Sequence, residues 1–187
     1  MIALALSPLG WARLFQQPAS SYHNLVVPLE RLTGPELPTR LAAAVQAIAD
    51  PGELKSMLDT LLPSLLIGAH ADEASIREMM TLLTDPGITR VQQIADRLNI
   101  TDRQLRSLAL RYFGMPAKIL MRRARFLRSY ARIGEMAGAK GYSDIDPGYF
   151  DLSHFLRDAK SFLGTTPRRF RAQCLYQQLG DSYEARP

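Results

Sequence analysis

The residues best suited to chemistry lie on one short predicted helix, within "NITDRQLRSLALRYFG" from Asn99 to Gly114. Four polar side chains occupy its first two turns, opposite an apolar stripe: Arg103, Gln104, Arg106 and Ser107. Arginine can donate two hydrogen bonds to guanine O6 and N7, and glutamine can pair with adenine N6 and N7. Residues near the start of a helix that enters the major groove are the ones that reach base edges. The pattern therefore predicts base recognition, with an ordinary solvated helix face as the alternative.

Two short capped helices are expected to position these side chains. Thr89 and Gln92 have the spacing of a capping box, and Thr101 and Gln104 repeat it. The apolar positions of each helix fall on one face, Val91, Ile94, Ala95 and Leu98 on the first and Leu105, Leu108, Ala109 and Tyr112 on the second. About three residues join the helices, which is the pattern of a helix-turn-helix, although many helical hairpins are similar.

A similar unit recurs later in the chain, since "LRSLALRYFGMP" resembles "FLRDAKSFLGTTP". Leu105 and Gly114 correspond to Phe155 and Gly164, an offset of 50 residues (155 minus 105). In the second copy we expect Asp151 to cap the helix, and Ser153, His154 and Arg157 to take the outward face. A closing helix should follow, with Thr166 as its cap and Pro167 at its first position.

A longer helix is predicted between the copies, over residues 116–136. One stripe is polar and mostly basic, and comprises Lys118, Arg122, Arg125, Ser129 and Arg132. Two stripes are apolar, Leu120, Ala124, Leu127 and Ala131 on one side and Ile119, Phe126, Tyr130 and Ile133 on the other. A helix with two apolar faces should be sandwiched between two small units. Its length of about 31 Å is close to one turn of B-DNA, roughly 34–36 Å, so it could hold two reading helices one turn apart.

Charge is unevenly distributed along the chain. Residues 1–86 carry five Lys/Arg and nine Asp/Glu, a balance of −4, whereas residues 87–187 carry eighteen and nine, a balance of +9. From Arg103 to Arg132 there are nine Lys/Arg and no Asp/Glu, which is typical of phosphate contact on a packed domain. A basic solvated surface is the alternative that charge alone leaves open.

Other classes of function find little support in the sequence. The chain has no glycine-rich phosphate loop and no G-x-S-x-G elbow, so we do not expect an enzyme. Its three histidines lack metal-ligand spacing, and the aspartates at 144, 146 and 151 flank a Pro-Gly turn, so no metal or cofactor is expected. A single cysteine, no signal peptide and no run of about 20 apolar residues predict a soluble cytoplasmic protein.

These motifs together resemble the AraC/XylS-type transcription regulators. The resemblance covers roughly residues 75–172 and lies in "VQQIADRLNITDRQLRSL…YFGMP", "RRARFLRS" and "YFDLSHFLRDAKSFLGTTPRRFR". It implies a DNA-binding unit of about seven helices with two helix-turn-helix subdomains. Matched by position, it implies base-reading roles for Arg103, Arg106 and Ser107 in the first copy, and for Leu152, Ser153, His154 and Arg157 in the second.

The chain departs from the family pattern in three places. Pro147 and Gly148 should shorten the helix that opens the second helix-turn-helix. Ala109 and Ala159 stand where the family usually has phenylalanine, which leaves each small core less to bury. Residues 1–70 are too few for the cupin-like sensor barrel that often precedes this domain, so we expect a truncated sensor tail whose "IALALSPLGWARLF" is a strand remnant.

The expected fold is therefore all-α, with two helix-turn-helix subdomains, at about 88–114 and 142–164, joined by a long linker helix. Residues 1–72 would be the sensor tail and helical connector, 73–174 the DNA-binding domain, and 175–187 a flexible tail. The residues expected to contact phosphates are Thr101, Arg111, Lys118, Arg122, Arg125, Arg168 and Arg169. Double-stranded DNA is the expected partner, with RNA polymerase and a second copy of the chain, held through the N-terminal segment, as further ones. The alternative function is a protein-interaction module that dimerises with or sequesters a full-length regulator and binds DNA weakly.

Overall fold

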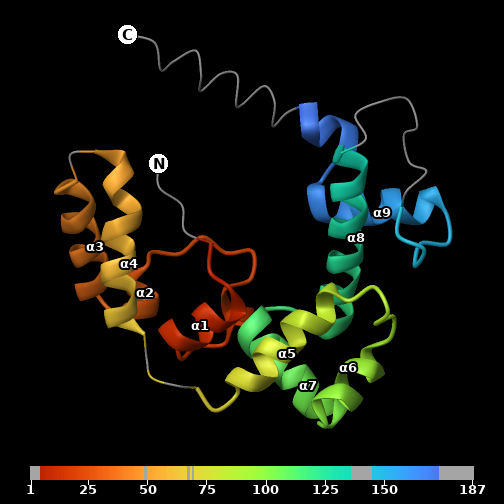
Figure 1. The fold of residues 1–187 in the computed structure, drawn as a ribbon, viewed down its shortest axis with the longest axis horizontal. Coiled ribbons are helices and arrows are strands. Elements are labelled where there is room, and N and C mark those ends of the chain that lie inside the picture. Colours follow the sequence, from red (N-terminus) through yellow and green to blue (C-terminus); the bar gives the residue numbers. More distant parts are fainter. Residues whose placement is uncertain (1–4, 49, 67, 69, 136–144, 173–187) are drawn as a thin grey trace. The chain divides into compact units, whose positions relative to one another are not determined.

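Helices account for nearly all the regular structure of the chain (Figure 1). The computed structural model describes residues 5–48, 50–66, 68, 70–135 and 145–172, and over these ranges it contains helices and turns but no strand. The polypeptide divides into two compact units, residues 1–117 and residues 118–187. The all-α class is confirmed for this part of the chain.

The first helix lies where the sequence analysis expected a strand. α1 spans Pro8–Leu14, so the prediction of a strand remnant is wrong for these residues. The hydroxyl oxygen of Ser7 accepts a hydrogen bond from the Gly10 amide at 3.0 Å, and Pro8 occupies the first helical position. A serine cap followed by proline starts a helix because the cap satisfies a free amide and proline needs none.

α1 is part of the core of the first unit. The Trp11 and Phe15 rings lie 4.6 Å apart, and the indole N–H donates to the Gln17 carbonyl at 2.8 Å. Arg13 contacts Glu73 at the start of α5 (Glu73–Thr84) at 2.6 Å. Hydrogen bonds from Arg13 and then Arg77 hold the pKa of the Glu73 carboxyl below its usual value. These contacts cross the boundary predicted between residues 72 and 73, so the N-terminal segment packs with the helices that follow it.

Three further helices of the first unit contain the start of the basic stretch and the helix that packs beneath it. They are α6 (Val91–Leu98), α7 (Asp102–Leu108) and the π-helical turn η3 (Ala109–Phe113). The short helix η1 (Ala19–Tyr22) packs against η3. Tyr112 is buried in η3, and its hydroxyl donates to the Asp72 carboxylate at 2.6 Å. Burial, followed by the bond to Asp72, raises the pKa of Tyr112 to about 12.

Gly114 ends the π-helical turn in a conformation that only glycine adopts freely. Its φ is +75°, and a Cβ atom there would lie 3.4 Å from the Ala19 carbonyl oxygen. We expect Gly114→Ala to lower the free energy of unfolding by about 1–2 kcal/mol, because left-handed backbone strains any β-carbon. Urea denaturation followed by helical circular dichroism, which reports both units, would measure it. The matched control is Gly164→Ala, at φ +71° with nothing within 4 Å of the added carbon. A Gly114 variant less affected than the control would contradict a role for the Ala19 contact.

Residues 30–66 form a group of helices whose described side chains do not build a buried core. These are α2 (Glu30–Thr33), α3 (Glu36–Gln46), η2 (Pro51–Glu53) and α4 (Leu54–Leu65), and α3 and α4 lie side by side in Figure 1. None of the residues described in α2, α3 and α4 is buried. The apolar side chains of α3 and α4 instead line an open groove of about 770 Å³ that includes Ile48, Met57 and Leu61.

The second unit is built on the long helix α8 (Ala117–Glu135) and on α9 (Leu152–Leu163). α8 runs unbroken over 19 residues, close to the 116–136 that the sequence predicts. Phe126 of α8 meets Phe155 and Phe162 of α9, at ring separations of 5.7 and 5.5 Å. A closing helix over 167–172 follows, and its Arg171 donates to the carbonyls of Tyr130 and Ile133 at 2.9 and 3.0 Å. Thr166 accepts a hydrogen bond from the Arg169 amide at 3.4 Å, which confirms it as the cap.

The three stripes of α8 differ from the prediction in which side chains are buried. Phe126, Tyr130 and Ile133 join the core of the second unit as expected. The other apolar stripe is open in its second half, where Leu127 is 47% exposed, so the prediction of two covered faces is wrong there. The supposedly outward polar stripe is partly internal, since Ser129 is fully buried and accepts from the Asp146 amide at 2.9 Å.

Candidate nucleic-acid interface

The first candidate helix, α7, is held to α6 by a tight turn of three residues, as predicted. Asn99 ends α6 in the left-handed conformation, with φ 51° and ψ 46°. The Ile100 amide then donates to the Ala95 carbonyl at 3.1 Å, which satisfies one of the last free carbonyls of α6. Ala95 is fully buried, and its small side chain allows α6 and α7 to pack closely. This geometry sets the direction in which α7 leaves the turn.

A capping box starts α7, as the spacing of Thr101 and Gln104 predicts. The Gln104 amide donates to the Thr101 hydroxyl at 3.3 Å, and the Thr101 amide donates to the Gln104 side-chain oxygen at 2.8 Å. The corresponding prediction for α6, with Thr89 and Gln92, is wrong. There the Gln93 side-chain oxygen accepts from the Arg90 amide at 2.9 Å, because the helix begins one residue later than expected.

The outward face of α7 contains the four side chains that the sequence analysis singled out. Arg103, Gln104, Arg106 and Ser107 are all exposed, while Leu105 and Leu108 are buried beneath them. The side-chain oxygen of Gln104 already accepts from the amide and the hydroxyl of Thr101, at 2.8 and 2.9 Å. Pairing with both adenine N6 and N7 needs that oxygen, so Gln104 could read a base in this way only by opening the cap.

The second candidate helix, α9, repeats the plan of α7 position by position. Thr101 and Asp151 are both N-caps, and the Asp151 carboxylate accepts from the His154 amide at 2.6 Å. Leu105 and Phe155 are both buried, as are Ala109 and Ala159. Gly114 and Gly164 end the two copies with φ of +75° and +71°. The repeat read from the sequence is therefore present in local structure as well.

The outward face of α9 is less polar than that of α7. Ser153 and Arg157 are exposed, and Leu152 is 39% exposed. His154 is only half exposed, because its ring packs edge-on against Tyr149 at 5.1 Å. Lys160, which the sequence analysis did not select, is exposed one turn beyond Arg157. Its i+3 spacing from Arg157 was the signal that could have identified it.

The segment before α9 forms a turn in place of a helix. Over residues 145–150 there is no helix, as Pro147 and Gly148 predict, and residues 142–144 lie outside the described ranges. The Asp146 carboxylate accepts from the Gly148 amide at 2.9 Å and from Arg128 at 2.9 Å. Asp146 and Asp151 thus serve a turn and a cap, which confirms that interpretation of the two aspartates.

A buried carboxylate connects this turn, α8 and α9. Asp158 is 1% exposed, and its two oxygens lie 2.6 Å from Arg122 Nη2 and 3.0 Å from the Tyr149 hydroxyl. Arg125 lies 3.7 Å from the same carboxylate, stacks over the Tyr149 ring at 4.4 Å and donates to the Gly148 carbonyl at 2.8 Å. Burial, followed by the bond to Asp158, raises the pKa of Tyr149 well above its usual value. Arg122 and Arg125 therefore bind an internal anion, which leaves their guanidinium groups less free to contact phosphates than the exposed cations.

The other expected phosphate contacts differ in how free they are. Arg111, Lys118, Arg168 and Arg169 are exposed. Thr101 is exposed too, but its hydroxyl is part of the capping box.

In the described part of the second unit, pairing of the internal acids leaves the exposed side chains mostly basic. Among its described side chains, Asp146 and Asp158 are buried beside arginines, and Asp151 is the exposed carboxylate. The exposed basic residues of the unit are Lys118, Arg123, Arg132, Arg157, Lys160, Arg168 and Arg169. Such a surface attracts a polyanion.

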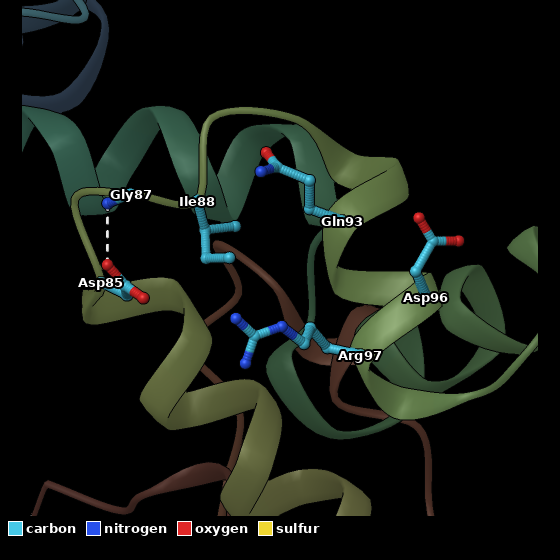
Figure 2. A pocket seen from close by; sticks show the side chains of 6 residues that line it. All are labelled: Asp85, Gly87, Ile88, Gln93, Asp96 and Arg97. Atoms are coloured by element: carbon cyan, nitrogen blue, oxygen red, sulfur yellow. Dashed lines mark hydrogen bonds between the residues drawn. The ribbon is translucent and has the colours of Figure 1, made fainter.

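The first unit also has a small polar depression at the start of α6. Figure 2 shows Arg97 extending from α6 toward the loop that holds Gly87 and Ile88. Asp85 lies at the end of α5, where this loop begins, and its carboxylate accepts from the Gly87 amide at 2.7 Å. The Asp85 carboxylate therefore stabilises the turn that joins α5 to α6.

Over the described ranges no group of three or more His, Cys, Asp or Glu side chains could hold a metal ion, and no helix is long and apolar enough to cross a membrane. Comparisons with protein-family models, curated proteins and solved structures found no match to this chain. The exposed faces of α7 and α9 are thus the candidate site.

Proposed function

We propose that this protein is a sequence-specific DNA-binding transcription regulator of the AraC/XylS type. In this proposal α6–α7 and the turn with α9 act as two helix-turn-helix units. Each presents the start of its second helix to a segment of the major groove. An α-helix fits that groove, and its N-terminal residues reach base edges.

The observation that carries the proposal is the sorting of charge in the second unit. Its aspartates at 146 and 158 are buried against Arg128 and Arg122, at 2.9 and 2.6 Å. Among the described side chains of this unit, the exposed cations outnumber the exposed carboxylate, Asp151, so neutralising DNA phosphates would release counterions and favour binding. A surface selected only for solubility would mix the two signs.

The common plan of α7 and α9 gives a second, independent support. The first copy comprises α7 and η3, and the second is α9. Each copy has an N-cap residue, buried positions four and eight residues after it, and a left-handed glycine at its end. Between these buried positions, Arg106 and Ser107 are exposed in the first copy and Arg157 is exposed in the second. Two reading surfaces of the same design suit an operator with two successive recognition segments.

Replacement of Arg106 by alanine tests base reading directly. We expect Arg106→Ala to weaken binding to a duplex selected from a random library by about 1–3 kcal/mol, and to relax preference at one base position. The control is Arg31→Ala, which removes the same charge from an exposed position in α2. Fluorescence anisotropy with selected and random duplexes would measure both. Equal losses on every duplex for Arg106→Ala would contradict base reading.

A second candidate function is self-association through residues 30–66. The half-buried apolar side chains of α3 and α4, and the open groove between them, favour this alternative because a second copy would cover them. Light scattering after gel filtration of the full chain tests it. A dimer that Met57→Glu and Leu61→Glu convert to monomer would support it, and a monomer at tens of micromolar would reject it.

A further inference from the structure

Among the described residues of the second unit, the most exposed large apolar side chain lies just before α9. Phe150 is 95% exposed, and the neighbouring Leu152 is 39% exposed. The corresponding residue before α7, Ile100, is half-buried. Tyr149 is itself 6% exposed, so the chain buries one aromatic ring at this point and presents the next to solvent.

Packing does not explain the position of Phe150. It precedes the N-cap Asp151, where an apolar residue usually packs against the fourth residue of the helix and fixes the entry of the chain. That fourth residue is Phe155, and the rings of Tyr149 and Phe126 already lie against it at 5.5 and 5.7 Å. With 95% of its surface exposed, Phe150 makes no such contact.

The surroundings of Phe150 indicate which partner it suits. The outward face of α9 carries Ser153, Arg157 and Lys160, and neither Arg157 nor Lys160 has an ion pair among the described residues. The nearby Asp151 carboxylate is engaged by the His154 amide at 2.6 Å. An apolar ring beside unpaired cations matches a duplex, whose backbone is anionic and whose major groove presents one apolar group, the thymine C5-methyl.

We infer that Phe150, assisted by Leu152, is a specificity-determining residue that contacts a thymine methyl group in the major groove. The inference rests on the proposed DNA-binding function and names part of the sequence that it recognises. The ring sits before the first turn of α9, at the end of a reading helix that approaches base edges. Removing a contact with one methyl group should weaken binding roughly fourfold, since burial of one such group has about that effect.

Methyl deletion in the DNA, combined with a change in the protein, tests this contact. The full chain would first select a duplex from a random library, and each thymine would then be replaced singly by uracil, which removes only the methyl group. We expect wild-type protein to lose roughly fourfold in affinity at one or two positions. Phe150→Ala should bind the thymine duplex about that much more weakly and no longer distinguish uracil, whereas Phe150→Leu should keep part of the difference. Because the ring is exposed, Phe150→Ala should leave the thermal midpoint and helical circular dichroism unchanged.

The possible failures are distinguishable. Absence of any preference for selected over random duplexes would overturn the proposed function and this inference together. A clear preference, with uracil tolerated everywhere or with uracil sensitivity unchanged in Phe150→Ala, would overturn this inference alone. The inference would also be overturned if Phe150→Ala altered only the oligomeric state, because that would indicate a protein partner. It would be overturned as well if the substitution altered only the unstacking of a 2-aminopurine base placed in the duplex, because that would indicate an intercalating side chain.

Discussion

Replacing Asp158 by asparagine is expected to lower the free energy of unfolding of the second unit by about 3 kcal/mol. The substitution removes the negative charge that Arg122 and Arg125 approach at 2.6 and 3.7 Å, and leaves their guanidinium groups without a counter-charge. Loss of one partner of a buried pair usually costs about 3–5 kcal/mol. The lower end applies because the Arg122 side chain is 37% exposed and remains partly hydrated. Urea denaturation followed by circular dichroism would measure the change.

Two comparisons make this result specific to the buried pair. Asp59→Asn breaks the exposed pair with Lys55, and we expect the urea midpoint to be unchanged because surface pairs contribute little. Trp11 fluorescence reports the first unit, so its transition should move less than the helical signal. An Asp158→Asn protein as stable as wild type would show that the two arginines need no internal anion.

Binding to DNA is expected to weaken by about three orders of magnitude between 50 and 200 mM salt. About six or more phosphates would be neutralised, and each contributes about −0.9 to the slope of log K against log salt. The exposed cations of the second unit, together with Arg111 of the first, are sufficient in number. Fluorescence anisotropy at a series of salt concentrations measures the slope, and a slope near zero would contradict electrostatic binding.

Single substitutions should separate the basic residues that contact DNA phosphates from those that bind an internal carboxylate. Lys118→Ala and Arg169→Ala remove exposed charges, so each should reduce the slope by about 1 and weaken all sequences alike. Arg122→Ala should instead leave the slope nearly unchanged and lower stability, because its guanidinium binds Asp158 at 2.6 Å. If Arg122→Ala flattened the slope as much as Lys118→Ala, its role as an internal ligand would be wrong.

Much of the fold could be predicted because its signals are local. The caps at Thr101, Asp151 and Thr166 and the terminal glycines act over a few residues, so their sequence positions indicate the helix boundaries. Helical periodicity placed Leu105, Leu108 and Phe155 in the core for the same reason. The outward side chains of α7 followed from that periodicity, and they remain the basis of the proposed site.

The wrong predictions also arise from local signals, because two signals compete within a few residues. Ser7 and Pro8 form a helix-start signal, but the apolar run around them predicts a strand, and the local cap decides the outcome. The start of α6 was displaced by one residue because Thr89 and Arg90 precede two adjacent glutamines, and either could have closed the cap. Gln104 was identified both as a cap and as a base reader, and its side-chain oxygen is engaged in the cap.

The sequence by itself determined where helices begin and end, which of their faces are apolar, and that the second half carries an excess of positive charge. Only the tertiary structure decided which of those charges remain available. Arg122 and Arg125 stand in one basic stripe with Lys118, yet Asp158, more than 30 positions away, comes to lie beside the two arginines. The physical reason is that periodicity along a helix records the direction of each side chain but not the charge of what packs against it. The pairing of a buried ion depends on residues that only folding brings together.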